Sequence, residues 1–444
     1  MKRYDSYKDS GVKWIGEIPS NWEKSRIRMV GDLYGGLTGK KGSDFNDDDN
    51  PSNKPFVPFT NIFNNTYISQ DHFQYVNVEE NENQNRVLKN DLFFLMSSES
   101  YEDLGKCSIL LDDVEELYLN SFCKGFRIKD SKVYPLFLNY QLLGSLHKEM
   151  ISVEGNGFTR INLRQDRLLD IPVFIPPLSE QQQIVSFLDI KTSLIDSLIE
   201  KTQRKIELLK EQRTSLINEV VTKGLNTNLE MKDSGFEWIG KIPSHWEFVK
   251  IGHLNRVVRG GSPRPSGDPR FFNGDFIHWI TVKDITSKTG KYVTTTDTKL
   301  TEEGMKQSRV LEPETLVLTN SGVTLGIPGI LKIRGCINDG SVGFLDMSPK
   351  IERDYLYYFW TTQTELLLEQ QSGYGQPNLN IEIVSNVRFP LPPLSEQQQI
   401  VEYLDEQTQK IDKTISIEEK RIQLLKEYKQ SLISEVVTGK KRVV

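Results

Sequence analysis

The sequence predicts an α+β protein in which two mixed α/β domains are separated by two long helices packed as an antiparallel coiled coil. Two internal duplications support this prediction. The segment PPLSEQQQIVSFLD at 176–189 recurs as PPLSEQQQIVEYLD at 392–405, and DSGVKWIGEIPSNWE from Asp9 recurs as DSGFEWIGKIPSHWE from Asp233. Each half therefore contains a tryptophan motif, a variable domain and a long helix. Antiparallel pairing of the helices relates the two halves by a pseudo-twofold axis.

The two long helices have recognisable beginnings and ends. Ser179 and Ser395 follow Pro-Pro and are expected as N-caps, with Gln182 and Gln398 at the capping-box spacing three residues later. No proline or glycine interrupts the first helix before Gly224, and the second is expected to end at Lys440, after the matching SLISEVVTGK. Roughly forty residues at 1.5 Å per residue span about 60 Å, so we interpret the pair as a spacer.

One side of each helix carries a stripe whose steps alternate between three and four residues, which is the period of a coiled coil. Two amphipathic helices buried separately in a core would also fit, but two copies in the same register favour packing of one helix on the other. The residues expected at this interface are Ile195, Ile199, Ile206, Leu209 and Leu216 on the first helix and Ile411, Ile415, Ile422, Leu425 and Leu432 on the second.

The duplications divide the chain into six segments. Trp14 and Trp22, repeated as Trp238 and Trp246, are expected to pack on the adjoining helix or domain. The segments are the N-terminal tryptophan motif (1–22), a first target-recognition-like domain (23–175), the central long helix (176–224), the second tryptophan motif (225–246), a second such domain (247–391) and the distal long helix (392–444).

The two variable domains share the order of their signals more than their residues. Each opens with a glycine loop, GGLTGKKG after Tyr34 and GGSPRPSG after Arg259, and each closes with another, GNGFTRINL from Gly155 and GYGQPNLNI from Gly373. Runs rich in β-branched and aromatic residues lie between, followed by helical stretches at 134–149 and 353–371. This order predicts short strands with functional loops.

Composition is typical of a globular protein of the cytoplasm. The apolar fraction is 37% and the charged fraction 26%, and no apolar stretch is long enough for a membrane span. The three cysteines and five histidines lack the spacing of a disulfide framework or a zinc site. The net charge of −6 does not exclude a nucleic-acid partner, because an acidic average can hide a basic face.

The sequence contains no motif for catalysis or for a cofactor. GGLTGKK lacks the spacing of a phosphate loop, and Lys41 stands where the Mg²⁺-binding hydroxyl would be. A dinucleotide fingerprint, a nucleophile elbow and the Asn/Asp-Pro-Pro-aromatic pocket of an amino-methyltransferase are likewise missing. A stand-alone methyltransferase or nuclease is therefore disfavoured, and we expect a non-catalytic chain without a metal or cofactor of its own.

The combined pattern resembles the specificity subunit of type I restriction-modification enzymes. The resemblance rests on both PPLSEQQQI helix starts, both W-I-G-x-I-P-x-x-W segments, the RGGSPRP loop, and the G-x-G and N-L residues before each helix: Gly155, Gly157, Asn162, Leu163, Gly373, Gly375, Asn378 and Leu379. It implies that each variable domain reads one half of a split double-stranded DNA site. It also implies two methyltransferase and two restriction/translocase subunits as partners, which would carry S-adenosylmethionine, ATP and Mg²⁺.

Loop residues with cationic, amide or hydroxyl side chains are the expected DNA contacts, because these groups match base edges and phosphates. Arg259 and Arg264 are the first candidates, since Gly260 and Gly261 allow close backbone approach to phosphate and the neighbouring prolines stiffen the loop. Further candidates on analogous loops are Lys40, Lys41, Ser98, Asn320 and Thr324.

The alternative function is a coiled-coil scaffold that presents two ligand-binding domains to protein partners and binds no DNA. The acidic runs at 47–49 and 112–116 favour it, although such runs are usually solvated loops. Salt-dependent binding to duplex DNA, which a scaffold would lack, separates the two functions.

Overall fold

In the computed structural model, the described residues are 2–45, 52–157, 159–226, 228–236, 239–288, 290–320, 322–364 and 379–443. The chain divides into two compact units: unit 1 comprises Met1–Thr202 and Lys420–Val444, and unit 2 comprises Gln203–Glu419. Three features from the sequence analysis, namely Trp238, the glycine loop at 373–378 and the acidic run at 47–49, lie outside the described residues.

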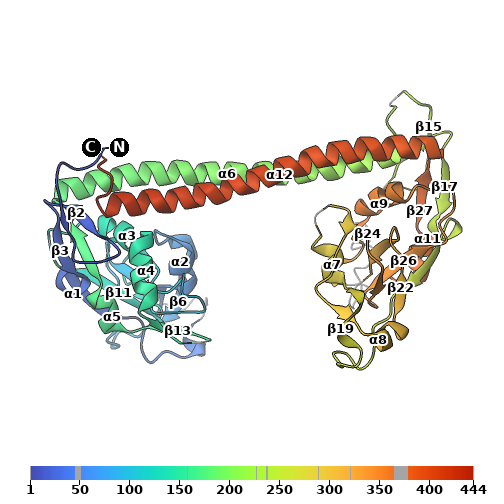
Figure 1. Cartoon of the computed structure of the whole chain (residues 1–444). Coiled ribbons are helices and arrows are strands. Elements are labelled where there is room, and N and C mark those ends of the chain that lie inside the picture. Colours follow the sequence, from blue (N-terminus) through green and yellow to red (C-terminus); the bar gives the residue numbers. More distant parts are fainter. Residues whose placement is uncertain are drawn as a thin grey trace. The chain divides into compact units, whose positions relative to one another are not determined.

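Two long helices, labelled in Figure 1, contribute to both units and confirm the predicted fold class. They are α6 (Leu178–Lys223) and α12 (Leu394–Val437). Each begins one residue before the predicted N-cap, so Ser179 and Ser395 lie in the first turn and do not cap it. The α12 helix also ends before Lys440, because Gly439 after it adopts a left-handed φ of 70°.

A glutamine of each SEQQQ segment, one residue before the predicted capping partner, fixes the helix start. Gln181 Nε2 donates to Pro176 O (2.8 Å) and Lys132 O (2.7 Å), and Gln181 Oε1 accepts from Tyr134 N. Gln397 makes the matching bonds to Pro392 O, Lys350 O and Glu352 N. The repeated glutamine therefore satisfies backbone groups of the neighbouring domain, which local sequence spacing could not indicate.

Within each unit the two helices run antiparallel. Charged residues of the two helices also pair with each other: Lys429 pairs with Asp196 (2.6 Å) in unit 1, and Arg213 pairs with Asp412 (2.8 Å) in unit 2. Of the ten predicted interface residues, Ile195, Ile206, Ile415 and Leu432 are buried and the other six are partly buried. Charge pairs that flank an apolar helix interface favour one register over its alternatives.

Unit 1 is built on an antiparallel sheet in the order β4-β11-β7-β9. Its strands are β4 (Gly31–Gly35), β11 (Cys123–Ile128), β7 (Leu92–Leu95) and β9 (Cys107–Ile109). The smaller sheets contain β10 (Tyr118–Leu119), β5 (Asn53–Val57) and β6 (Gln74–Asn77); β12 (Gly155–Asn156), β13 (Ile161–Leu163) and β8 (Ser97–Ser98); β1 (Tyr7–Asp9) with β2 (Glu17–Pro19); and β3 (Glu23–Arg26) with β14 (Pro172–Ile175).

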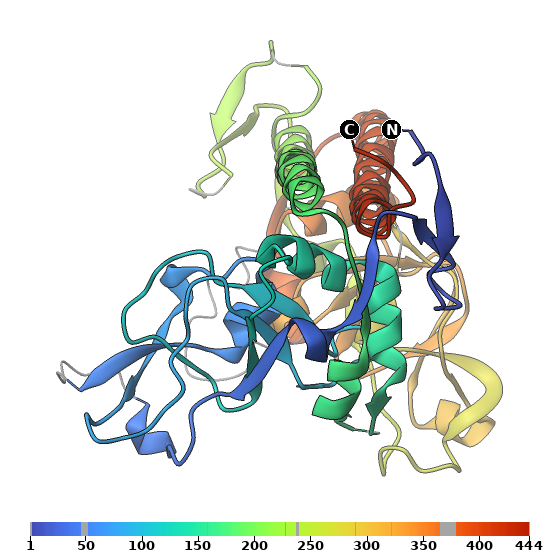
Figure 2. The same ribbon diagram turned by 90° about the vertical axis from the view of Figure 1, so that its left-hand side faces the viewer.

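The helices of unit 1 are short, apart from its share of α6 and α12. They are α1 (Ile27–Val30), α2 (Phe59–Asn64), α3 (Pro135–Leu143), α4 (Ser145–Val153) and α5 (Gln165–Asp170), with 3-10 turns η1 (Gly42–Asp44) and η2 (Gln70–His72). The single helix expected at 134–149 is thus two helices, because Gly144 between them is extended, with a ψ of 143°. The two ends of the chain lie side by side, where Lys2 forms an antiparallel bridge with Arg442 (Figure 2).

Unit 2 repeats this architecture with additions. Its main sheet, β18-β26-β23-β24-β20, contains β18 (Arg256–Arg259), β26 (Ser341–Leu345), β23 (Leu316–Thr319), β24 (Pro328–Leu331) and β20 (Tyr292–Val293). A second sheet contains β21 (Lys299–Leu300), β19 (Phe272–Ile280), β25 (Gly335–Ile337) and β22 (Arg309–Leu311), and two-stranded pairs join β15 (Met231–Asp233) to β16 (Lys241–Pro243) and β17 (Glu247–Lys250) to β27 (Arg388–Leu391).

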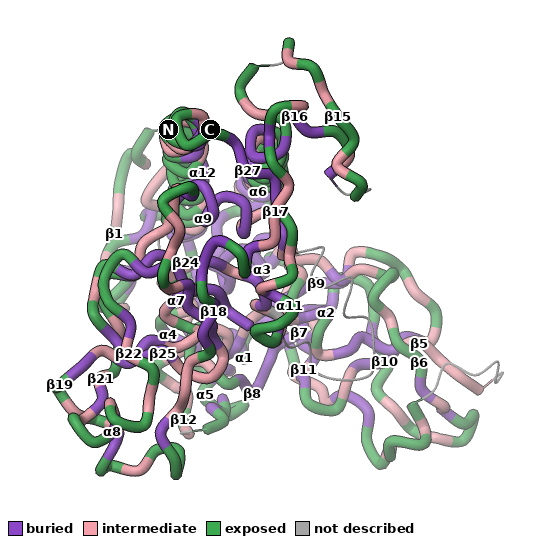
Figure 3. Tube along the Cα trace, turned by 90° about the vertical axis from the view of Figure 1, so that its right-hand side faces the viewer, coloured by how far each residue is buried: buried purple, intermediate pink, exposed green. Residues whose placement is uncertain are grey.

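The described short helices of unit 2 are α7 (Val282–Thr286), α8 (Glu302–Lys306), α9 (Arg353–Thr361) and α11 (Ile381–Asn386), with 3-10 turns η3 (Ile251–His253) and η4 (Gly322–Thr324). Burial in this unit is concentrated on the main sheet and α9 (Figure 3). Its largest core also contains Val221 of α6 and Leu404 of α12, just as the largest core of unit 1 contains Leu188 and Val436. Each domain is therefore packed directly on one end of the helix pair.

Candidate nucleic-acid interface and helix contacts

The second glycine loop, after β18, packs closely against the turn at 338–340. A Cβ on Gly260 would lie 2.0 Å from Asn338 O, so this position requires glycine. The neighbouring Gly260 N and Gly261 N donate to Ser341 O (2.9 Å) and Ile337 O (3.1 Å). Close packing within the domain therefore explains the glycine at position 260, in addition to the close approach to phosphate that the sequence predicts.

Asp339 of this turn gathers three of the predicted DNA contacts. Arg264 Nη2 lies 3.1 Å from Asp339 Oδ2, Arg259 Nε donates to Asp339 O (3.1 Å), and Asn320 Nδ2 approaches the same carbonyl (3.3 Å). Ser262 Oγ completes the cluster by donating to Asp339 Oδ1 (2.6 Å). The Arg264 side chain remains 72% exposed. An exposed ion pair of this kind is weak, so the guanidinium can be transferred to a phosphate or base at little cost.

The equivalent loop of unit 1 has different chemistry. When the two sheets are aligned by their strand registers, Gly36 matches Gly260 and Lys40 matches Arg264. This differs by one residue from aligning the two Gly-Gly pairs by sequence. The Lys40 side chain is only 8% exposed and pairs with Glu82 (2.5 Å), whose pKa is lowered by hydrogen bonds from Lys40 and Gln84. Lys40 is thus committed to an internal pair, whereas Lys41 is exposed.

The remaining two predicted contacts lie elsewhere. Ser98 is buried at the end of β8 and accepts a hydrogen bond from Ser100 N, where it lines a cavity of about 600 Å³ in unit 1. Thr324 lies in the 3-10 turn after β23, and its carbonyl accepts from Thr319 Oγ1. Within the described residues, no hydrogen bond joins either residue to its domain's glycine loop.

Phe122 and Arg160 form a surface of unit 1 that sequence reasoning missed. Phe122 follows β10 in the turn that corresponds to 338–340 of unit 2, and its side chain is 63% exposed. The Arg160 guanidinium lies 5.8 Å from the Phe122 ring centroid and donates to Ser97 Oγ (2.6 Å). An exposed aromatic beside an arginine can contact bases by apolar, stacking and cationic interactions. Only the strand pairing brings these segments together.

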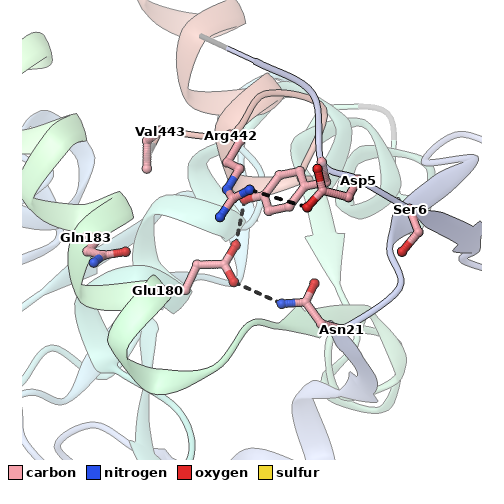
Figure 4. A pocket seen from close by; sticks show the side chains of 8 residues that line it. Asp5, Ser6, Asn21, Glu180, Gln183, Arg442 and Val443 are labelled. Atoms are coloured by element: carbon pink, nitrogen blue, oxygen red, sulfur yellow. Dashed lines mark hydrogen bonds and ion pairs between the residues drawn. The ribbon is translucent and has the colours of Figure 1, made fainter.

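The second tryptophan of each motif, Trp22 and Trp246, is buried and has the packing role that the sequence predicts, whereas Trp14 is 44% exposed and does not. Trp22 Nε1 donates to Glu180 Oε1 (3.1 Å) in the first turn of α6, and Trp246 Nε1 donates to Glu396 Oε2 (2.9 Å) at the matching position of α12. In unit 1, Glu180 also accepts from Tyr4 Oη (2.6 Å), beside a polar pocket of about 470 Å³ (Figure 4). Burial and this hydrogen bond raise the pKa of Tyr4, which keeps its hydroxyl a donor.

Among the described residues, no three His, Cys, Asp or Glu side chains are arranged to hold a metal ion, and no helix is long and apolar enough to cross a membrane. The three cysteines are buried and unpaired. Burial raises the pKa of the Cys123 thiol to about 12, so this group is inert as a nucleophile near neutral pH.

The family model for the type I restriction modification DNA specificity domain matches residues 19–209 and again 243–427. The chain belongs to this specificity family. A curated relative, the type I restriction enzyme MjaVIII specificity subunit of Methanocaldococcus jannaschii, is 26% identical over 98% of this chain and 97% of its own length. The EcoKI specificity subunit of Escherichia coli K12 is 24% identical over 45% of this chain and 44% of its own.

Solved structures of specificity subunits have the same fold. A chain from work on complex assembly and conformational transition of the type I R-M system matches with a TM-score of 0.74 and 16% identity, covering 95% of this chain and 98% of that one. The HsdS subunit from Thermoanaerobacter tengcongensis matches with a TM-score of 0.54 and 16% identity over 96% and 98%. The sequence-based resemblance to this family is therefore confirmed: the chain is a type I specificity subunit.

Proposed function

We propose that this chain reads a bipartite double-stranded DNA site, one half with each recognition domain, and performs no catalysis itself. What supports the proposal is the difference between equivalent loops on one shared sheet topology. Unit 2 presents Arg259 and Arg264 around Asp339, whereas unit 1 presents Phe122 beside Arg160. Two such surfaces would favour two different short sequences, because guanidinium and aromatic groups contact different base edges.

Two methyltransferase subunits are the proposed occupants of the outer faces of the helices. Exposed apolar side chains there occur in both units: Ile190, Leu194, Leu424 and Tyr428 in unit 1, and Leu208, Tyr403 and Ile417 in unit 2. Leu194, for example, is 61% exposed. Exposed apolar side chains that together form a patch mark interaction sites. In this proposal S-adenosylmethionine, ATP and Mg²⁺ are bound by the methyltransferase and by two restriction/translocase subunits.

Exchange of one recognition domain tests this function. Residues 23–175 are replaced by the corresponding domain of another family member, and methylated sites are mapped genome-wide with the partner subunits present. We expect one half of the site to change and the other half to persist. An exchange that alters both halves together would contradict independent reading.

The acidic balance of the chain keeps a scaffold without DNA binding as the second candidate function. It predicts no affinity for duplex DNA at any salt concentration. DNA binding instead weakens steeply with salt, because bound counterions are released. A titration of the assembled complex at several salt concentrations therefore separates the two candidates.

A further inference from the structure

Each long helix carries an aspartate that takes hydrogen bonds from the recognition domain packed on it. Asp189 of α6 and Asp405 of α12 occupy matching positions of the repeat, and each is followed three residues later by a buried threonine. Tyr140 of α3 donates to Asp189 Oδ1 (2.6 Å), and Tyr358 of α9 donates to Asp405 Oδ1 (2.5 Å). This part of the arrangement is the same in both units.

The second partner of each aspartate differs between the units. In unit 1, Tyr67 Oη donates to Asp189 Oδ1 (2.6 Å) and lies 2.8 Å from Tyr140 Oη. In unit 2, Lys291 Nζ donates to both carboxylate oxygens of Asp405, at 2.7 and 2.8 Å. A neutral phenol in one domain and an ammonium in the other therefore both donate hydrogen bonds to the aspartate of the long helix.

Both partners lie in a segment that pairs with the fourth strand of the domain's main sheet, β9 in unit 1 and β24 in unit 2. Tyr67 forms an isolated parallel bridge with Ile109 of β9. Lys291 precedes β20, and its carbonyl accepts from Ile330 N of β24 (2.9 Å). Since β9 and β24 hold equivalent places in the two sheets, each contact connects the helix to the sheet that carries the recognition loops.

The Lys291 contact is embedded among further charges. Lys291 Nζ also pairs with Asp354 of α9 (2.5 Å), and its side chain is 11% exposed. Burial alone would lower the pKa of Lys291, but hydrogen bonds and charges from Asp354 and Asp405 together outweigh burial and raise it. The lysine is therefore charged at neutral pH, and charge-assisted hydrogen bonds of this kind are about twice as strong as neutral ones.

These aspartates supply a further polar attachment along each helix, in addition to the packed core and the contact to the end of the other helix. Another lies at the helix start, where Gln181 and Gln397 bind backbone carbonyls of their domains. Asp189 and Asp405 lie two turns further on, about 12 Å along the axis. A polar contact two turns beyond the helix start resists a change in the angle between domain and helix. A pivot of only about 6° moves a point about 30 Å away by one base-pair rise of about 3.4 Å.

We propose that the Asp189–Tyr67 and Asp405–Lys291 contacts are positioning contacts that fix each recognition domain on the helix pair and thereby make the complex discriminate the length of the DNA spacer. This inference rests on the proposed reading of a bipartite site. Tyr67 and Lys291 touch no DNA in this scheme. Their loss relaxes spacer length and leaves the half-site sequences unchanged.

The test uses the chain assembled with its methyltransferase subunits. After the wild-type half-sites are mapped, methylation rates are measured on duplexes with the native spacer and with spacers one or two base pairs shorter or longer. The variants are Tyr67→Phe and Lys291→Met, with Lys291→Arg as the conservative replacement. Lys283→Met is the matched control, because Lys283 forms an exposed ion pair with Asp297 (2.8 Å) in the same domain.

We expect the preference for the native spacer over its neighbours to fall at least fivefold in Tyr67→Phe and in Lys291→Met. Lys291→Arg should restore it, and Lys283→Met should match the wild type. Loss of rate by the same factor at every spacer, or an unchanged preference in both variants, would overturn the inference. Tyr67→Phe removes a single oxygen atom, so the test stands even if Lys291→Met does not fold. A wild-type complex without any bipartite site would instead refute the proposed function.

Discussion

Gln141 of α3 donates a hydrogen bond from Nε2 to the carbonyl oxygen of Val437, the last residue of α12, over 3.0 Å. In unit 2 the hydroxyl of Tyr355 in α9 donates to Val221 O in the last turn of α6 (2.9 Å), which is the matching position. Carbonyls in the last turn of a helix have no partner within it. Two chemically different side chains thus bond the carbonyl oxygen at the matching helix end. Because Gln181 and Gln397 fix the helix starts, each recognition domain contacts the end of one helix and the beginning of the other.

Replacement of Gln141 by leucine should destabilise unit 1. Gln141 also donates to Phe174 O (2.8 Å) and accepts from Phe174 N (3.0 Å), so the change leaves three buried backbone groups without partners. At roughly 1–3 kcal/mol for each, we expect the free energy of unfolding to fall by at least about 3 kcal/mol. Urea unfolding measures this, with the exposed Gln423→Leu as control. Equal stability of the two variants would contradict the assigned role.

His147 should make unit 1 less stable in acid. Its Nε2–H donates to Pro172 O (3.1 Å), and complete burial lowers the pKa of the imidazole to about 4. Between pH 6.5 and 4 the unfolded chain binds a proton that the native chain does not, so stability falls by up to about 3 kcal/mol as the pH drops. His147→Gln should flatten this part of the pH profile, and the exposed His72→Gln should not. Parallel profiles for His147→Gln and the wild type would exclude the histidine as the cause.

Arg264→Ala should weaken binding of the assembled complex to DNA by roughly 1–3 kcal/mol and, if the contact is to phosphate, reduce the salt slope by about one. The exposed guanidinium and its weak pair with Asp339 make it available to DNA. Arg334→Ala is the control, because Arg334 has a similar pair with Glu312 (2.9 Å) but precedes β25, at the opposite end from the loop. Unchanged affinity in Arg264→Ala would remove the loop from the interface.

Leu194→Glu combined with Tyr428→Glu should prevent docking of the methyltransferase subunit on unit 1. Both side chains are exposed on the helix pair, so the fold should tolerate the change while an apolar interface would not. Size-exclusion chromatography of the mixed subunits measures the stoichiometry. Gln212→Glu places a single negative charge on an exposed polar position of α6 and should assemble normally. Full assembly of the double variant would place the docking surface elsewhere.

The sequence predicts the helices well because their signals are local and duplicated. Period, length and the Pro-Pro start all lie within one segment, and Arg213 and Lys429 pair with aspartates of the facing helix. The capping prediction was wrong, because each helix begins one residue before the predicted N-cap and the glutamine next to the predicted capping partner binds the neighbouring domain.

The recognition surfaces were predictable only in part. The RGGSPRP loop marked Arg259 and Arg264, but nothing local marked Asp339, which lies more than seventy residues away and forms the centre of the cluster. The contact between Phe122 and Arg160 likewise depends on the order of strands within unit 1. Short strands with non-local pairing leave weak periodicity, so loop partners cannot be assigned from spacing alone.

The last prediction concerns the length of the helix pair. An insertion near Gly224 would fall inside unit 2, whereas the division between the units falls after Thr202 in α6 and after Glu419 in α12. Because the helices are antiparallel within each unit, both must be lengthened together. We therefore consider duplication of one heptad in each helix, residues 196–202 in α6 and 420–426 in α12, which repeats the stripe without a change of register.

The paired duplication adds about 10 Å, close to the rise of three base pairs. We expect methylated sites with both half-sites unchanged and a spacer longer by up to three base pairs, as mapped genome-wide. Duplication in α6 alone leaves α12 too short to match it, so the apolar contact between the two helices is lost in one unit. Assembly with the methyltransferase should then fail. An active paired variant with the original spacer would show that something other than these helices measures the DNA. The half-sites would then have to be separated by the partner subunits, since within this chain α6 and α12 are the segments shared by both units.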